Sequence, residues 1–187
     1  VDRGAPYAIP DTNPFANGGG DPTLVAWGLH RPLGLSFAFN SLWIADVGQN
    51  SIDEINRMQL DTLGANFGWP LLGGQTCLAR TDECFVVSTT FPELLLDRLS
   101  ADGCGFVPGE HYRGTCLPDL QGQYIAADAC TGRVGSLVNS EVGIVLNSLL
   151  SDASEVRNQL AAIGTDGFGE LYLVTRESGK VFRMQVE

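Results

Sequence analysis

The segment Ser41–Met58, SLWIADVGQNSIDEINRM, has the pattern of two strands joined by a polar turn. Its first part is apolar with Trp43 near the start, the turn holds Gly48, and a second strand-like run follows. The same order recurs in GQYIAADACTGRVGSL, residues 122–137, and in GELYLVTRESGKVFRM, residues 169–184. These three pieces predict three antiparallel hairpins.

Further strand-like runs extend each hairpin into a meander. The expected strands are 33–39, 42–47, 52–58 and 67–72, then 85–89, 110–113, 123–127 and 133–138, then 144–149, 159–164, 170–175 and 180–186. Each meander spans roughly 45 residues, which is the period of a β-propeller blade, although a β-sandwich also fits the strand count. We therefore predict an all-β chain of about three antiparallel four-stranded blades. A loop over 1–24 precedes blades at 25–75, 76–140 and 141–187.

Three blades are too few for a closed ring, because propellers close with about four to eight. An open half would expose sheet edges and apolar faces. The sequence thus predicts a partner, either a missing N-terminal half or a second copy related by a twofold axis. Since the first residue is Val1 and no signal-peptide pattern follows it, a processed chain or a fragment is also expected.

The charge balance limits the classes of partner. The 11 Lys and Arg residues against 22 Asp and Glu residues give a formal net charge of −11. This charge repels phosphate backbones and anionic lipid, so we expect neither nucleic acid nor membrane as a partner. The longest apolar runs, such as Leu94–Leu96, are far short of the roughly 20 residues of a membrane helix.

The five cysteines favour disulfides over zinc, since no C-x-x-C pair occurs. Cys77–Cys84 brackets a loop, and Cys104–Cys130 would tie a strand to a turn, which leaves Cys116 as the odd thiol. Cys116–Cys130 is the competing pair. Disulfides are typical of an oxidising compartment, so an extracellular or periplasmic location is expected.

Six segments in order resemble one family, the PQQ-dependent glucose/sorbosone (aldose sugar) dehydrogenases, which include Hedgehog-interacting-protein-like relatives. The segments are PYAIPDTNPF (6–15), WGLHRPLGLSF (27–37), LWIADVGQNSIDEINRM (42–58), GANFGWP (64–70), HYRGTCLPDLQGQYIAADACTGRVGSL (111–137) and GTDGFGELYLVTRESGKVFRM (164–184). The family fold is a six-bladed propeller, and these motifs belong to its C-terminal half. The resemblance therefore implies half of such a propeller.

The resemblance also implies a cofactor, pyrroloquinoline quinone (PQQ), held over a calcium ion on the propeller axis. The family's calcium-binding carbonyls map onto Gly48 and Gln49. The family's Arg-Asn pair, which contacts the cofactor, maps onto His30-Arg31. A later cofactor arginine maps onto Arg157. Arginine suits the carboxylates of PQQ, and calcium takes hard oxygen ligands.

This chain departs from the family at two cofactor positions. His30 stands where the family has arginine, and the family lysine aligns near Cys130. The family's catalytic histidine belongs to the N-terminal half, so catalytic residues of this chain are unknown. Two hypotheses follow: the complete protein oxidises an aldose with PQQ and calcium, or it is a non-catalytic extracellular scaffold or binding module.

Other groups have simpler interpretations. Asp46, Asn50, Asp53 and Glu54 look like a calcium loop but lack EF-hand spacing. The sequence HYR at 111–113 is expected to be a packed strand rather than an active site. The tryptophans Trp27, Trp43 and Trp69 are expected to pack between blades rather than to contact a sugar.

Overall fold

The computed structural model describes residues 8–78, 84, 88–97, 105–140, 143–148, 156 and 159–185. The described chain is built mainly of strands, with a 3₁₀ turn at Pro118–Leu120. The strands are β1 (Ala26–Trp27), β2 (Pro32–Ala38), β3 (Ser41–Asp46), β4 (Ile52–Gln59), β5 (Ala65–Asn66), β6 (Leu72–Gly73), β7 (Thr76–Cys77), β8 (Leu94–Asp97), β9 (Phe106–His111), β10 (Tyr124–Asp128), β11 (Val134–Ser140), β12 (Gly143–Ser148), β13 (Leu160–Thr165), β14 (Leu171–Thr175) and β15 (Val181–Arg183).

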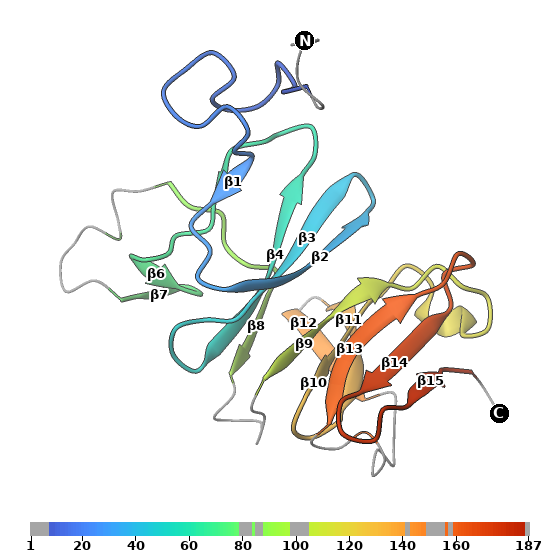
Figure 1. Ribbon diagram of the computed structural model, residues 1–187. Helices are drawn as coiled ribbons and strands as arrows, with labels where there is room; N and C mark the ends of the chain where they lie inside the picture. Colours follow the sequence, from blue (N-terminus) through green and yellow to red (C-terminus); the bar gives the residue numbers. More distant parts are fainter. Residues whose placement is uncertain are drawn as a thin grey trace.

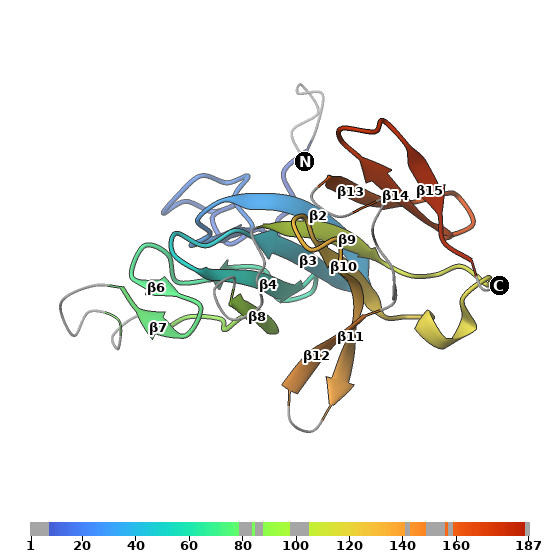
Figure 2. The ribbon, with the colours of Figure 1, turned by 90° about the horizontal axis from the view of Figure 1, so that it is seen from below.

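Three antiparallel sheets form the body of the molecule, in the orders β2-β3-β4-β8, β9-β10-β11-β12 and β13-β14-β15. The first strands of consecutive sheets contact one another, β2 with β9 and β9 with β13. Figure 1 shows these three strands running in the same direction, and Figure 2 shows the sheets stacked like blades. The expected hairpins β3–β4, β10–β11 and β14–β15 are all confirmed.

Three apolar clusters hold these layers together, because each sheet buries the alternate side chains of its strands. The first and second sheets share Ala45, Ile55, Leu94, Phe106, Tyr124 and Ala126. The second and third share a larger cluster that includes Val107, Ile125, Val134, Leu160, Leu171 and Leu173. The other face of the first sheet buries Leu42, Ile44 and Met58 under Ala65, Phe67 and the segment around β1.

That last face is covered only in part. Leu35 pairs with Ile44 and Phe37 pairs with Leu42, so the outward side chains of β2 continue the same apolar face. Leu33, Leu35 and Phe37 are 53%, 58% and 61% exposed, and we call these three residues the β2 stripe. An apolar row of this size on one strand marks a surface that normally has a partner.

Two strand assignments differ from the sequence-based expectation. Residues 144–149 were expected to begin the last blade, but β12 pairs with β11 from Gly135↔Ser148 to Ser140↔Gly143. The fourth strand of the first sheet is β8 instead of 67–72, because the apolar run Leu94–Leu96 pairs along β4. Local spacing could not reveal either pairing, since partner choice depends on tertiary packing. Most of the expected strand 85–89 lies outside the described residues.

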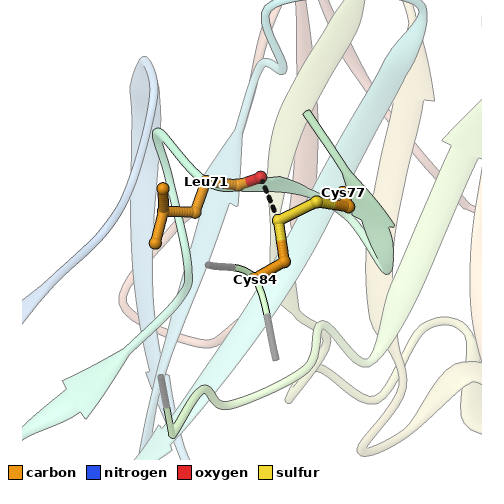
Figure 3. Close-up of a disulfide and its surroundings, with 3 residues drawn as sticks. All are labelled: Leu71, Cys77 and Cys84. Atoms are coloured by element: carbon orange, nitrogen blue, oxygen red, sulfur yellow. Dashed lines mark hydrogen bonds between the residues drawn. A yellow bond between two sulfur atoms is a disulfide. The ribbon is translucent and has the colours of Figure 1, made fainter. Parts of the chain in front are cut away.

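The cysteines follow the predicted scheme where they are described. Cys77 and Cys84 form a disulfide with a Cα–Cα distance of 5.8 Å, beside the Leu71 carbonyl (Figure 3). Cys116 is a free thiol, as predicted. Cys130 is disulfide-bonded, and its predicted partner Cys104 lies outside the described residues.

Candidate functional site

Antiparallel pairing brings the predicted cofactor and metal residues to one end of the first sheet. His30 and Arg31 directly precede β2, and the turn with Gly48 and Gln49 follows β3, its antiparallel neighbour. The turns β10–β11 and β14–β15 lie along the same edge, the lower one in Figure 1. Arg157, the third predicted cofactor residue, lies outside the described residues.

Asp46 anchors the cation-bearing segment. This carboxylate is only 2% exposed, and its two oxygens accept the backbone N–H of His30 (2.8 Å) and of Arg31 (2.6 Å). The Arg31 carbonyl in turn accepts the N–H of Val47 (3.1 Å). Hydrogen bonds to a charged group are the stronger kind, so Asp46 fixes the backbone from which both side chains project.

The His30 ring is held in a defined orientation. Its Nδ1 lies 2.7 Å from the Val47 carbonyl oxygen, and its ring meets the Trp69 ring edge-on with centroids 5.4 Å apart. A carbonyl can only accept, so Nδ1 carries the hydrogen. The side chain of Arg31 is exposed, whereas His30 is half-buried.

The Gly48–Gln49 turn is held from two sides. Gly48 donates its N–H to Asp53 Oδ1 (3.2 Å), and a Cβ at Gly48 would collide with the Ile52 carbonyl oxygen. The Trp69 Nε1–H donates to Gln49 Oε1 (3.3 Å), which ties the turn to the ring beside His30. The structure thus places all four described candidates together, as the sequence predicted. Their binding roles stay a prediction.

The acidic side chains under this turn are committed to internal contacts. Glu54 accepts hydrogen bonds from Asn56 Nδ2 and from the backbone N–H of Gly74. Burial raises the pKa of Glu54, and the neighbouring charges of Asp46 and Asp53 add to the rise. Among the described residues, no group of three His, Cys, Asp or Glu side chains could hold a metal ion. The metal donors that this turn offers are therefore the backbone carbonyl oxygens of Gly48 and Gln49.

A second polar cluster lies between the first and second sheets at the opposite end. His111 is 3% exposed, packs against Trp43 and Tyr124, and has Nδ1 3.5 Å from Ser36 Oγ. Burial, with the charge of Arg113, lowers the pKa of His111 to about 4. Burial raises the pKa of Tyr124 to about 12. This cluster packs the two sheets together, as expected for the HYR strand.

Sequence reasoning missed three site residues: Asp46 as an anchor, Asp53 as the support of the turn, and Trp69 as the neighbour of His30. Asp46 and Asp53 were considered only as metal ligands, and Trp69 only as a packing residue. Trp69 is in fact 38% exposed and belongs to no apolar cluster of the described residues. Trp43, in contrast, does pack between sheets.

The stacked sheets and the residues gathered at one end define the chain as part of a β-propeller. It belongs to the glucose/sorbosone dehydrogenase family, whose model matches residues 6–183. It is similar in structure to the apo form of the soluble aldose sugar dehydrogenase from Escherichia coli, with a TM-score of 0.67 and 23% identity over 96% of this chain. The PQQ-bound form of aldose sugar dehydrogenase from Streptomyces coelicolor gives 0.62 and 19%, also over 96% of this chain.

The chain spans about half the length of these relatives, 51% of the first and 49% of the second. A further structure, a glucose dehydrogenase, gives a TM-score of 0.71 at 21% identity over 96% of this chain and 52% of its own. The fold is therefore about half of a six-bladed β-propeller, built from three antiparallel sheets. In the part of the chain that the structure describes, no helix is long and apolar enough to cross a membrane.

Proposed function

We propose that this chain is the C-terminal half of a secreted sugar-dehydrogenase-like propeller, whose complete form oxidises an aldose with PQQ and calcium. The observation that carries the proposal is the contact of His30 and Arg31 with Val47, the residue directly before the Gly48–Gln49 turn, at one end of the first sheet. The family and the PQQ-bound relative support the choice of cofactor.

The donor groups at this end suit the cofactor and its metal in part. Arg31 offers an exposed guanidinium, which binds carboxylates through two parallel hydrogen bonds. The backbone carbonyls of Gly48 and Gln49 are of the hard-oxygen type that calcium takes. PQQ, when bound, supplies the acceptor for the hydride from C1 of the aldose. Asp46 would hold Arg31 in place, and the remaining donors would come from the rest of the propeller.

The β2 stripe supports a partner for this half. Its apolar row lies on the face that continues the third apolar cluster, where a preceding blade would pack in a closed ring. The partner is a missing N-terminal half or a second copy of this chain. The Cys77–Cys84 disulfide supports an extracellular or periplasmic location, because such bonds persist in oxidising compartments.

A non-catalytic scaffold or binding module is the second candidate, and two observations favour it. His30, at the family's arginine position, has Nδ1 committed to the Val47 carbonyl. Cys130, near the family's lysine position, is tied up in a disulfide and offers no cation. Neither position therefore carries the arginine or lysine that the family has beside its anionic cofactor.

A titration of the complete protein with PQQ and calcium, followed by absorbance, separates the two candidates. The enzyme hypothesis expects saturable binding and dye reduction by glucose. Arg31→Ala should weaken PQQ binding by about tenfold or more, since a charged hydrogen-bonding partner is lost. Arg113→Ala, at the opposite end of the sheets, should leave it unchanged. No saturable binding of PQQ would favour the scaffold.

A further inference from the structure

A pocket of about 320 Å³ lies at the end of the first sheet opposite the candidate cofactor site. It is lined by the β2–β3 turn, by Leu60 directly after β4, and by His111 and Arg113 at and after the end of β9. The β2–β3 turn is at the upper end of the first sheet in Figure 1, away from the Gly48 turn. A pocket of this size fits a small molecule, and none of its lining residues belongs to the proposed PQQ or calcium site.

The β2–β3 turn holds an exposed aromatic ring in an unfavourable backbone conformation. Phe39 and Asn40 have φ angles of 50° and 57°, between the paired residues Ala38 and Ser41. Two-residue turns of this kind favour Asn and Gly, and a bulky side chain at positive φ is an outlier. Phe39 is 71% exposed, so burial of its ring does not explain the conformation. Outliers of this kind cluster at functional sites.

The Phe39 ring is held beside the pocket by contacts with the second sheet. It meets the His111 ring edge-on with centroids 5.6 Å apart, and it lies so close to Gly122 that a Cβ there would be 3.3 Å from the ring. The Asn40 carbonyl accepts the backbone N–H of Leu60 (2.9 Å), which fixes the turn from the side of β4. Leu60 is itself 39% exposed. Phe39 and Leu60 therefore offer apolar surface in fixed positions.

Arg113 gives this pocket its charge. Its side chain is exposed and makes no hydrogen bond or ion pair with the described residues. The pKa of His111 is lowered to about 4, so that ring is neutral at pH 7. Among the described residues, no acidic side chain lines the pocket, although the net charge of the chain is −11. The described lining thus combines one positive charge with apolar side chains.

We infer that this pocket binds a small monocarboxylic acid whose other end is an aromatic ring. The ligand ring would pack on Phe39 and Leu60, and its carboxylate would accept two parallel hydrogen bonds from the Arg113 guanidinium. A phosphate ester or a dicarboxylate suits the pocket less well, because its second charge would have no cationic partner. Phe37 also lines the pocket, but it belongs to the β2 stripe and would contact the propeller partner. The inference therefore rests on the other side chains, and it goes beyond the proposed function.

The experiment is a titration of the complete protein with 3-phenylpropionate, followed by calorimetry and by the NMR signal of Arg113 Nε–H. We expect saturable binding of one ligand per chain, with a shift of the Arg113 signal. The amide 3-phenylpropanamide has the ring without the charge, and acetate has the charge without the ring. Each should bind about tenfold more weakly or worse. Because the pocket is at the opposite end, one equivalent of PQQ should leave the affinity for 3-phenylpropionate unchanged.

Two variants with matched controls locate the binding site. Arg113→Ala should weaken binding about tenfold or more, whereas Arg133→Ala, at an exposed arginine of the β10–β11 turn, should not. Phe39→Asn should weaken binding to a similar degree without lowering Tm, because Asn tolerates a positive φ. Phe168→Asn is its control, since Phe168 is an exposed phenylalanine (87%) of the β13–β14 turn that does not line the pocket.

The wild-type Arg113 signal and the two ligand analogues keep the test decisive if a variant does not fold. No saturable binding of 3-phenylpropionate, equally strong binding of the amide or of acetate, or displacement by PQQ would overturn the inference. So would folded Arg113→Ala and Phe39→Asn variants that bind 3-phenylpropionate as the wild type does.

Discussion

Asp46 is the residue on which the geometry of the candidate site depends. It lies at the end of β3, buried, and receives two backbone N–H groups from the segment that precedes β2. A single carboxylate thereby fixes the direction of both His30 and Arg31. A backbone segment without regular pairing needs such a side-chain partner, because its N–H groups would otherwise be unsatisfied.

Replacing Asp46 with Asn should lower the free energy of unfolding by about 1–3 kcal/mol, since the amide keeps one acceptor and loses the charge. The amide NMR signals of His30 and Arg31 should shift in the same variant. The matched control is Asp61→Asn, whose carboxylate accepts a hydrogen bond from its exposed neighbour Thr62. Equal stability of Asp46→Asn and wild type, with unmoved His30 and Arg31 signals, would contradict the anchoring role.

His111 gives the interface of the first two sheets a dependence on acid. Its pKa is lowered to about 4 from the ordinary 6.5, so the unfolded chain binds the proton more readily. The contribution of the neutral His111 ring to the free energy of unfolding is fully present above pH 6.5. It is lost as pH falls from 6.5 toward 4. Allowing for solvent screening, we expect a loss of about 1–2 kcal/mol between pH 7 and pH 5.

His111→Phe keeps an aromatic ring between Trp43 and Tyr124 but removes the titrating group. Chemical denaturation at pH 7 and pH 5 should therefore show a smaller pH dependence in the variant than in the wild type. If both proteins lose the same stability over this range, His111 is not the residue responsible.

At the scale of elements, Glu170 joins the second and third sheets. It precedes β14, and its carboxylate accepts hydrogen bonds from Tyr112 Oη (2.7 Å) and from the backbone N–H of Thr115 (2.8 Å) and Cys116 (3.1 Å). These hydrogen bonds lower the pKa of Glu170 to about 2, and the bond from Tyr112 has the largest effect. The connection after β9 is thereby held against the turn before β14.

Glu170→Gln should lower Tm by about 5 °C at pH 7. The glutamine amide has one oxygen that accepts and one nitrogen that can only donate, so at least one of the three hydrogen bonds is lost. The depressed pKa means that the wild type has this stabilisation above about pH 4.5 and loses it as pH falls toward 2. The difference in Tm between variant and wild type should therefore shrink at pH 3. Glu177→Gln, an exposed residue of the β14–β15 turn, serves as the control. A Tm difference that is the same at pH 7 and pH 3 would contradict this account.

The hairpins were predictable from sequence because their turns are local. Trp43 and Tyr124, each near the start of its hairpin, stack with centroids 5.8 Å apart across the first two sheets. The strand β8 and the pairing of β12 with β11 were not predicted, since such pairing is decided by the sheet that each strand meets. The proximity of His30 to the Gly48 turn was predicted from the short meander between them. The contacts of Trp69 with Gln49 and His30 were not predicted, because these residues are far apart in the sequence and no local pattern indicates that they meet.

At the scale of the whole molecule, the β2 stripe is the feature that calls for a partner. Replacing Leu35 and Phe37 with Ser should increase the solubility of the isolated chain, because exposed apolar side chains drive association. The same change should weaken assembly with the partner, as measured by analytical ultracentrifugation. Val181→Ser, another exposed apolar position (64%), lies on the last sheet and tests the opposite face. Assembly that Leu35→Ser and Phe37→Ser leave unchanged would place the partner elsewhere.

The central claim is that this chain is half of a closed propeller, and the size of the native species tests it most directly. Light scattering of the protein from its source, with the intact mass of its polypeptide, gives both the assembly and the chain length. We predict a particle of at least about twice the 20.0 kDa of this chain, made of one longer polypeptide or of two copies. A stable, monodisperse 20.0 kDa monomer in dilute solution would contradict the account.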